Sequence, residues 1–267
     1  MPVVPAPLIP AVTSRADLGV VGLEHLRAMG VDAFVTTRFG GVSPAPYDTL
    51  NLGDHVGDDP SRVEENRRRV AAALDLAPSQ LAISRQVHGA VVNDLDEWDG
   101  EALVGDAMVS TRDDVALAVL VADCVALLFV EASGPRVAVA HAGWRGLVEG
   151  VIPATLAHFE RPDDVRVVLG PHISPARYQV GPEVAEHFES IAGACREDEG
   201  DRRRLDLGVI ARYQLGLAGV ALELVEELGH NDDSDLFFSD RAQRPCGRFA
   251  LVVRRTPYHS SVHLETP

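Results

Sequence analysis

The feature that most constrains the fold is an apolar run over residues 115–131, which reads VALAVLVADCVALLFVE. A run this rich in Val and Leu is typical of a strand that is buried on both faces. Asp123 interrupts the run, and no apolar stretch in the chain reaches the ~20 residues that a transmembrane helix needs. The run therefore predicts a buried strand of a soluble protein rather than a membrane span.

Apolar segments recur along the chain and alternate with predicted helices. A helix is expected after Asp59, which can cap it, with Pro60 in the first turn and Val63, Val70 and Leu74 on one face. Further strands are predicted at 31–41, 81–92, 106–110, 135–143, 165–170, 221–228 and 248–255, and further helices near 146–160, 182–194 and 206–219.

The order of these elements shows no strict βαβ repeat, no internal repeat and no clear linker. A single mixed domain of the α/β (α+β) class is the simplest architecture that accounts for it. We expect a loose leader over residues 1–17, one catalytic domain over 18–255 and a polar tail over 256–267.

Charge composition narrows the chemistry. The chain has 267 residues and a formal net charge of −16, and a surface this acidic repels nucleic acid and anionic lipid, so we expect neither as a partner. The sequence contains no lysine, so all 24 basic residues are arginines. Schiff-base catalysis and a P-loop lysine are therefore excluded, and a phosphate would have to be held by arginine, backbone N–H groups or a metal.

The cysteines and the N-terminus bear on the compartment. Cys124, Cys195 and Cys246 are odd in number and irregularly spaced, which does not resemble a disulfide framework. The opening MPVVPAPLIPAV lacks a basic region and is broken by prolines, so it is not typical of a signal peptide. We expect a cytoplasmic protein that is a monomer or a small homo-oligomer.

Three predicted strands each carry a metal-capable side chain at or near one end. These are His88 in RQVHG, Cys124 in VADCVA and His141 in AHAGWRG. One thiolate and two imidazoles suit zinc and leave one coordination position open, which is the pattern of catalytic sites. The spacing is long-range, so the alternatives stay open: Cys124 as a small buried apolar residue, and the histidines as core or turn residues.

Polar residues beside these motifs are candidates for a supporting role. Asp123 lies in an apolar run, where an isolated carboxylate is costly, so it needs a histidine, an arginine or backbone N–H groups as a partner. We consider Asp106, Asp123 and Gln86 as residues that orient the metal ligands or carry a proton, with His55 as a further proton shuttle.

A second constellation suggests an anion site. Arg38 precedes two glycines, where backbone N–H groups and a guanidinium can hold an anion, and Asn51 and His55 follow in a long loop over 43–60. A capped turn with surface charges is the alternative explanation. Arg145 has the same two interpretations: it binds an anionic substrate group, or it pairs with Asp106 or Asp123.

Six motifs follow one another between about residues 31 and 255: TTRFGGVSPAPYDTLNLGDHVGDDPSRVEENRRRV, RQVHG, ADCVALLF, AHAGWRGLVEGV, LGPHISPARYQVGPEV and LFFSDR. Together they resemble the laccase-domain (YfiH-like) family, whose members were first named multicopper polyphenol oxidases and later described as purine nucleoside phosphorylases. The resemblance covers nearly the whole chain, and six collinear motifs make it highly specific.

The resemblance implies a single domain with a four-layer α/β/β/α sandwich of mixed sheets. It implies that His88, Cys124 and His141 bind zinc and act in catalysis, because they match the QVHG, ADC and HAGWRG motifs one for one. It also implies phosphorolysis of adenosine, inosine, guanosine and methylthioadenosine to the base and ribose 1-phosphate, together with adenosine deamination.

Three places depart from the family's pattern. Gly229-His230-Asn231 stands where the family often carries Cys-Thr, Ser239-Asp240-Arg241 where it often has Ser-Tyr-Arg, and His172 where Ala is common. The three metal-ligand positions are unchanged, so these departures bear on the substrate range rather than on the chemistry.

Other functions remain as alternatives. Copper-dependent phenol oxidation is the family's older name, but a blue-copper site usually adds an axial methionine, and only Met108 lies near a motif. A metal-free cysteine hydrolase would use Cys124 as nucleophile with His88 or His141 as its base. A binding protein that retains the pocket without turnover is the last alternative.

Overall fold

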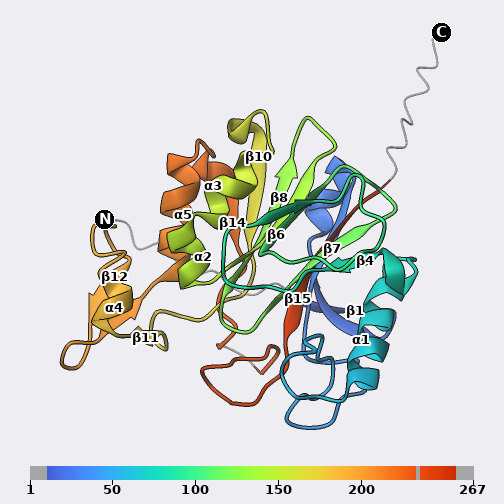
Figure 1. Ribbon diagram of the computed structural model, residues 1–267, viewed down its shortest axis with the longest axis horizontal. Helices are drawn as coiled ribbons and strands as arrows, with labels where there is room; N and C mark the ends of the chain where they lie inside the picture. Colours follow the sequence, from blue (N-terminus) through green and yellow to red (C-terminus); the bar gives the residue numbers. More distant parts are fainter. Residues whose placement is uncertain (1–10, 233–234, 257–267) are drawn as a thin grey trace.

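Two six-stranded sheets form the centre of the computed structural model, which describes residues 11–232 and 235–256 (Figure 1). The first sheet has the order β1 (Val12–Arg15), β2 (Leu18–Gly22), β3 (Val31–Thr36), β15 (Phe249–Arg255), β7 (Ala116–Val121) and β4 (Leu81–Ile83). The second has the order β14 (Val225–Glu227), β10 (Val165–Leu169), β8 (Val125–Glu131), β9 (Val137–Ala142), β6 (Ala107–Ser110) and β5 (Val92–Asp94). Both sheets mix parallel and antiparallel neighbours.

Helices cover the outer faces of the two sheets. The helices are α1 (Pro60–Ala72), α2 (Trp144–Glu149), α3 (Val151–Leu156), α4 (Pro182–Ala185) and α5 (Leu207–Leu217). Short 3₁₀ turns occupy Glu24–Met29, Pro78–Gln80, Pro162–Asp164 and Leu222–Leu224, and a small third sheet contains β11 (Gln179–Val180), β13 (Arg203–Leu205) and β12 (Cys195–Glu197). Among the described residues, no helix is both long and apolar enough to cross a membrane.

The alternation of side chains along β7 and β8 produces the layers, because successive residues of a strand point to opposite faces. On β7, Leu117 and Val119 join a core between the two sheets, whereas Ala118 and Leu120 face outward and pack with residues of α1. On β8 the outward side contributes Phe129 to a core shared with α3 and α5. The protein is thus a single mixed domain with an α/β/β/α sandwich, as the resemblance implied.

The apolar run 115–131 is two strands and not one. It breaks at residues 122–124, so β7 lies in the first sheet and β8 in the second. Asp123 turns the chain with a φ of 92°, a backbone conformation that costs energy for a non-glycine residue. Periodicity could not reveal this break, because both strands are buried on both faces and read as one apolar segment.

The predicted strand 81–92 also divides between the sheets. Its ends form β4 and β5, and the residues between them form a loop in which His88 has a φ of 62°. The predicted helix 146–160 is split into α2 and α3 at Gly150, whose φ of 85° ends the first helix. The helix after Asp59 is confirmed, with the Asp59 carboxylate accepting a hydrogen bond from the Ser61 N–H at 2.9 Å.

Two other expectations need correction. The leader expected over 1–17 is ordered in its second part, because Val12–Arg15 form β1 and pair with β2 along the sheet edge. The helix predicted at 182–194 is a single turn, α4, followed by turns that lead into β12. The tail from residue 257 and the first ten residues of the leader lie outside the described part of the chain.

Candidate metal centre and substrate cavity

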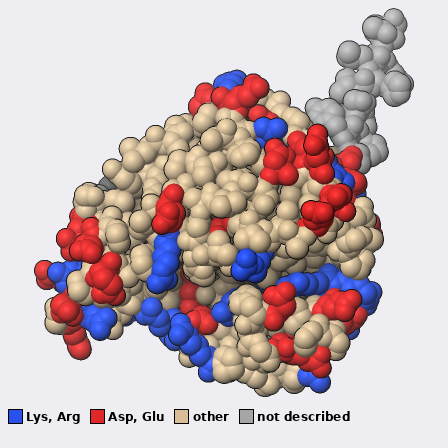
Figure 2. Space-filling view, viewed as in Figure 1, with Lys and Arg blue, Asp and Glu red and all other residues tan. Residues whose placement is uncertain are grey.

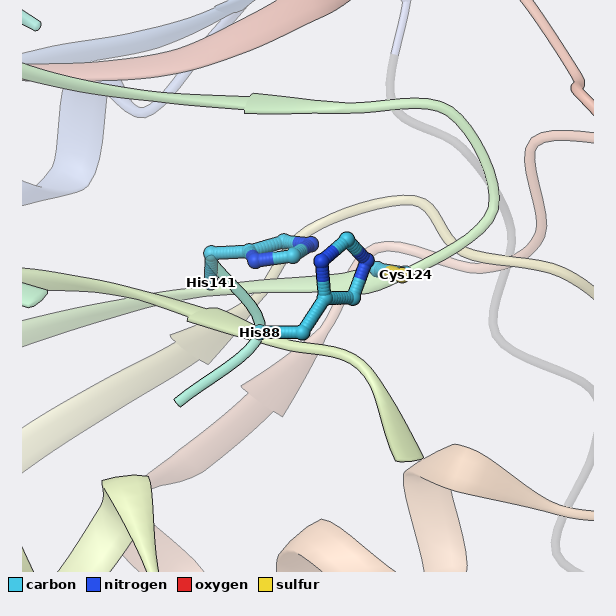
Figure 3. A group of neighbouring side chains, drawn as sticks. All are labelled: His88, Cys124 and His141. Carbon is cyan, nitrogen blue, oxygen red and sulfur yellow. The ribbon is translucent and has the colours of Figure 1, made fainter. Parts of the chain in front are cut away.

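Three segments that are distant in sequence bring His88, Cys124 and His141 together (Figure 3). His88 lies in the loop after β4, Cys124 at the turn between β7 and β8, and His141 near the end of β9. One ligand atom from each residue lies within 4.8 Å of the others, and the two imidazoles meet edge to face with centroids 4.7 Å apart. The structure therefore places the three predicted metal ligands in one group.

Asp106 organises two of these three ligands. Its buried carboxylate accepts the His141 Nδ1–H at 2.9 Å and the backbone N–H of His88 at 2.8 Å, Gly89 at 2.8 Å and Val87 at 3.1 Å. Burial alone would raise the pKa of Asp106, but these donors lower it below its ordinary value. Fixing the Nδ1 proton leaves Nε2 of His141 free to bind a metal, which is the arrangement that metal-ligand histidines usually have.

The group carries charge even without a metal. Burial raises the pKa of the Cys124 thiol, but the opposing charge of His141 and hydrogen bonds from both histidines outweigh it and lower the pKa to about 6. Burial lowers the pKa of His141, and the Cys124 thiolate and Asp106 more than compensate, raising it to about 9. A divalent cation such as zinc can take the place of the His141 proton, because it binds the thiolate and the neutral imidazole together.

Gly143 allows the close approach of these segments. A Cβ atom at this position would lie 2.9 Å from the Cys124 Sγ, closer than real Cβ atoms come, and 3.1 Å from the His88 Cδ2, which is also tight. The glycine of AHAGWRG is therefore required by the space that the metal-ligand side chains occupy.

The three ligands line a cavity of about 760 Å³. Figure 2 shows basic side chains gathered around a hollow in the lower half of the viewed face. Six arginines contribute to the lining, which is notable in a chain with a net charge of −16: Arg67, Arg85, Arg145, Arg241, Arg244 and Arg248. The cavity thus concentrates the positive charge that an anionic substrate requires.

Most of these arginines are already engaged, and two are not. Arg67 pairs with Asp54 at 3.3 Å, and Arg248 pairs with Asp240 at 3.1 Å. Among the described residues, neither Arg85 nor Arg145 has an ion-pair or hydrogen-bond partner for its guanidinium, although Arg145 lies 4.3 Å above the Trp144 ring. Arg145 therefore does not pair with either candidate aspartate, and its charge faces the cavity.

Arg38 and Asn51, which the sequence suggested as anion-binding residues, do not line the cavity that contains His88, Cys124 and His141. The Arg38 guanidinium donates to the Asp48 carbonyl at 2.9 Å, pairs with the Asp48 carboxylate at 3.2 Å and faces a different hollow. Asn51 is fully buried, and its amide is used by backbone groups and by the Asp58 carboxylate. The polar residues of this loop hold the loop itself together, as the alternative explanation of a capped turn predicted.

His55 does reach the cavity. It lies beside Asp54 at 3.6 Å and lines the same wall as Arg248. Burial and then the charge of Arg248 lower its pKa below the ordinary value, and Asp54 only partly offsets them. The imidazole is therefore neutral at pH 7 and able to accept a proton.

Asp123 and Gln86 form hydrogen bonds to other parts of the protein rather than to a metal-ligand side chain. Asp123 accepts hydrogen bonds from Asn231 Nδ2 at 2.9 Å, Ser239 Oγ at 2.6 Å and the Arg241 N–H at 2.6 Å, so its partners are hydroxyl, amide and backbone donors and not a metal-ligand histidine. Gln86 pairs through both amide groups with the backbone of Leu120, at 2.8 Å each. Both residues line the cavity, with each of their side-chain oxygens already accepting a hydrogen bond from the protein.

Trp144 has two roles in the structure. Its ring lines the cavity and also packs against the outer core of the second sheet. It stacks with the His187 ring at 6.2 Å between centroids, and the Arg145 guanidinium also lies over it. Tyr178, which the sequence did not reveal, adds a second aromatic ring to the lining, and burial raises the pKa of its hydroxyl.

The other unpredicted residues are arginines at 67, 85, 241, 244 and 248. Arginine is the sole basic residue type of this chain and recurs along its whole length, so no local pattern marks these positions. Arg85 had one usable signal, its place immediately before the QVHG motif.

A mixed α/β sandwich with a His–Cys–His group in the lining of an arginine-rich cavity defines the class of this protein. Residues 32–256 match the family model described as multi-copper polyphenol oxidoreductase laccase, and the chain belongs to this family.

Curated relatives and a solved structure are consistent with this family assignment. A protein of Pseudomonas aeruginosa named purine nucleoside phosphorylase is 43% identical over 229 residues, which covers 84% of this chain and 93% of the relative. The purine nucleoside phosphorylase YfiH of Escherichia coli is 40% identical over 228 residues, with the same two coverages. The crystal structure of YlmD from Geobacillus stearothermophilus has a TM-score of 0.84 and 31% identity, and covers 94% of this chain and 100% of that one.

Proposed function

We propose that this protein is a zinc-dependent purine nucleoside phosphorylase that acts on adenosine, inosine, guanosine and methylthioadenosine and also deaminates adenosine. The observation that carries the proposal is the placement of His88, Cys124 and His141 in a cavity that also holds two unpaired arginines. The names of the relatives supply the reaction class.

The donor set fits zinc. Two imidazoles and one thiolate are ligands that zinc prefers, and Asp106 presents Nε2 of His141 in the metal-binding tautomer. Met108, the candidate axial ligand for copper, is fully buried in the core between the sheets and does not line the cavity. Bound zinc would supply a Lewis acid to the reacting group.

Arg85 and Arg145 are the proposed phosphate-binding residues. Phosphorolysis joins a phosphate oxygen to C1′ of the ribose while the bond from C1′ to the base breaks, so the enzyme must hold a dianion beside the sugar. A guanidinium with no partner of its own can form two parallel hydrogen bonds to phosphate. Trp144 and Tyr178 offer ring faces for the purine.

His55 is the proposed proton-transfer residue. Among the candidates of the sequence, Asp106 and Asp123 have their carboxylate oxygens occupied by several donors each. His55 lines the cavity with an exposed imidazole and a lowered pKa, so it can accept or return a proton at neutral pH.

One incubation tests the proposal. Metal-quantified protein is mixed with adenosine, with and without phosphate, and adenine, inosine and ribose 1-phosphate are measured. We expect adenine and ribose 1-phosphate only with phosphate, inosine in both cases, and loss of all three products in Cys124→Ala. Cys195→Ala is the matched control, because this cysteine lies outside the cavity lining. Unchanged turnover in Cys124→Ala would remove the proposal.

A metal-free cysteine hydrolase is the second candidate, and one observation favours it. The arrangement suits a nucleophile, a base and a residue that orients the base, which would be Cys124, His141 and Asp106. The two functions separate on treatment with a chelator: the phosphorylase loses activity and regains it with zinc, whereas the hydrolase keeps its activity and is inactivated by alkylation of Cys124.

We also infer a cytoplasmic protein that acts on small nucleosides and not on nucleic acid, as a monomer or a small homo-oligomer. The net charge of −16 supports the exclusion of nucleic acid. Sedimentation of the purified protein, with and without DNA, measures both its size and this exclusion.

A further inference from the structure

A second group of metal-capable side chains lies behind one wall of the cavity. It contains His172, which follows β10, Glu227 at the end of β14, and His230 shortly after it. One ligand atom from each lies within 4.8 Å of the others. Because β10 and β14 are parallel neighbours, the segments that follow them leave the same edge of the sheet.

The His172 imidazole is the unusual member of this group. It is fully buried, and its Nδ1–H donates to the Gly170 carbonyl at 2.9 Å. Its Nε2 has no hydrogen-bond partner among the described residues and faces the Glu227 Oε1 at 3.7 Å. With the proton on Nδ1, two lone pairs point at each other in a buried space, which is unfavourable unless a cation lies between them.

Glu227 is held in position from its other side. Its Oε2 accepts a hydrogen bond from the Arg212 Nε at 3.1 Å, which leaves Oε1 directed at His172. Burial lowers the pKa of His172 and outweighs the raising effect of Glu227.

Gly208 leaves space over the same atoms. A Cβ atom there would lie 3.0 Å from the His172 Nε2 and 3.1 Å from the Glu227 Oε1, with the Asp206 Oδ1 at 3.5 Å. This glycine is in the first turn of α5, where alanine would favour the helix by about 1 kcal/mol. The helix therefore lacks a methyl group at the point that a bound ion and its ligands would occupy.

We propose that His172, Glu227 and His230 bind a second divalent transition-metal ion, zinc by its donor set, in a structural role. Two imidazoles and one carboxylate are a common zinc-ligand set, and the hydrogen bond from Nδ1 to a carbonyl fixes the tautomer that binds through Nε2. The Asp206 carboxylate, which caps α5 by accepting the Val209 N–H at 3.0 Å, adds negative charge near the group.

The position of this site explains what the ion does. Ile173 and Leu207 line the substrate cavity and are the immediate neighbours of His172 and Gly208. An ion bound here ties the segment after β10, the segment after β14 and the start of α5 into one wall. This site is separate from the His88 group, and its binding of a metal does not depend on whether the protein is a phosphorylase.

Metal counting tests the proposal directly. Purified protein is stripped with a chelator, reloaded with zinc, desalted and analysed for metal per chain. We expect two equivalents in the wild type, one in Cys124→Ala, one in His172→Ala and none in the double variant. Gly208→Ala keeps every ligand but fills the space, and should also hold one. His158→Ala, which changes an imidazole remote from both groups, should hold two.

Cobalt and thermal unfolding give two further readouts. Cobalt-loaded His172→Ala should keep the thiolate-to-metal absorption of the Cys124 site, and Cys124→Ala should lose that band while retaining a weaker cobalt spectrum. Zinc at about one hundred times its Kd should raise the unfolding midpoint of Cys124→Ala by roughly 5–10 °C. A folded Cys124→Ala protein that holds no zinc overturns the proposal, as does a double variant that binds as much zinc as Cys124→Ala.

Discussion

Two polar regions of this protein contain the same kinds of residue and do different things. The loop between β3 and α1, residues 37–59, and the cavity around the metal group both combine arginine with aspartate and histidine. In the loop, Arg38 pairs with Asp48, while Asn51 and Asp58 bond to each other and to backbone groups. In the cavity, Arg85 and Arg145 are unpaired among the described residues.

The difference shows how structural and functional polar groups are told apart. A polar side chain whose donors and acceptors are all used within the protein stabilises the fold and has nothing left for a ligand. A charged side chain that faces a cavity without a protein partner keeps its donors available for a ligand. Sequence motifs mark both kinds of residue alike, since the pairing that separates them is made by segments distant in the chain.

The largest effect should come from Asp106, which is both structural and functional. Its carboxylate oxygens both accept hydrogen bonds within the protein, and two of those bonds position His88 and His141. Asp106→Asn replaces an acceptor by an amide that cannot accept all four donors. We expect zinc affinity and phosphorolysis to fall roughly 100-fold. Zinc titration and steady-state kinetics measure both, with Asp163→Asn as the exposed control. A fall of less than threefold in both would contradict the positioning role.

Asn51→Ala tests whether the loop is structural. Removing the amide leaves the Arg248 N–H and the Asp58 carboxylate without their partner, so the free energy of unfolding should fall by about 2 kcal/mol, roughly thirtyfold in the folding equilibrium. Urea denaturation measures this, and Asn93→Ala, whose contacts are 3.3 Å or longer, should lose far less. A raised KM for phosphate with unchanged stability would instead make Asn51 a substrate residue.

A pair of arginine variants compares the two regions directly. Arg145→Ala should raise the KM for phosphate about tenfold without loss of stability, because its guanidinium has no ion-pair partner to lose. Arg38→Ala should lower stability and leave the KM for phosphate unchanged, because its partner is Asp48. The KM for phosphate and the urea denaturation midpoint of both variants test this comparison. A raised KM in Arg38→Ala and a lowered stability in Arg145→Ala would instead support the anion site that the sequence suggested at Arg38.

The smallest effect concerns the cysteines. In metal-free protein the pKa of Cys124 is about 6, so its thiolate persists above pH 6 and is lost as the pH falls through 6. Burial raises the pKa of Cys195 above its ordinary value, so its thiolate forms only at alkaline pH. We expect Cys124 to be alkylated a few-fold faster than Cys195 at pH 7, with a rate that halves near pH 6 and vanishes when zinc is added. Mass spectrometry of the modified protein follows both sites, and an alkylation rate for Cys124 that rises only above pH 8 would contradict the thiolate–imidazolium pair.

The sequence predicted the parts of the site that motifs encode. His88, Cys124 and His141 were each recognisable beside an apolar strand, and the resemblance assigned them to one site, where the structure brings them together. It could not separate Arg38 from Arg145, or identify Arg85 and Tyr178, because the cavity wall is assembled from segments more than a hundred residues apart.

What the sequence determined by itself is the character of each segment. Val and Leu runs specify strands buried on two faces, and Asp59 and Pro60 specify the start of α1. The absence of lysine leaves arginine, backbone N–H groups or a metal to bind any phosphate. These properties depend on neighbours along the chain, so local patterns record them.

Only the tertiary structure decided where the long apolar run breaks, and with it the location of the site. The turn at Asp123 moves the chain from one sheet to the other, and that turn is held by Asn231, Ser239 and Arg241, more than a hundred residues away. The same turn sets Cys124 beside the two histidines. Since the stabilising donors come from the far end of the chain, no window of sequence around the turn contains them.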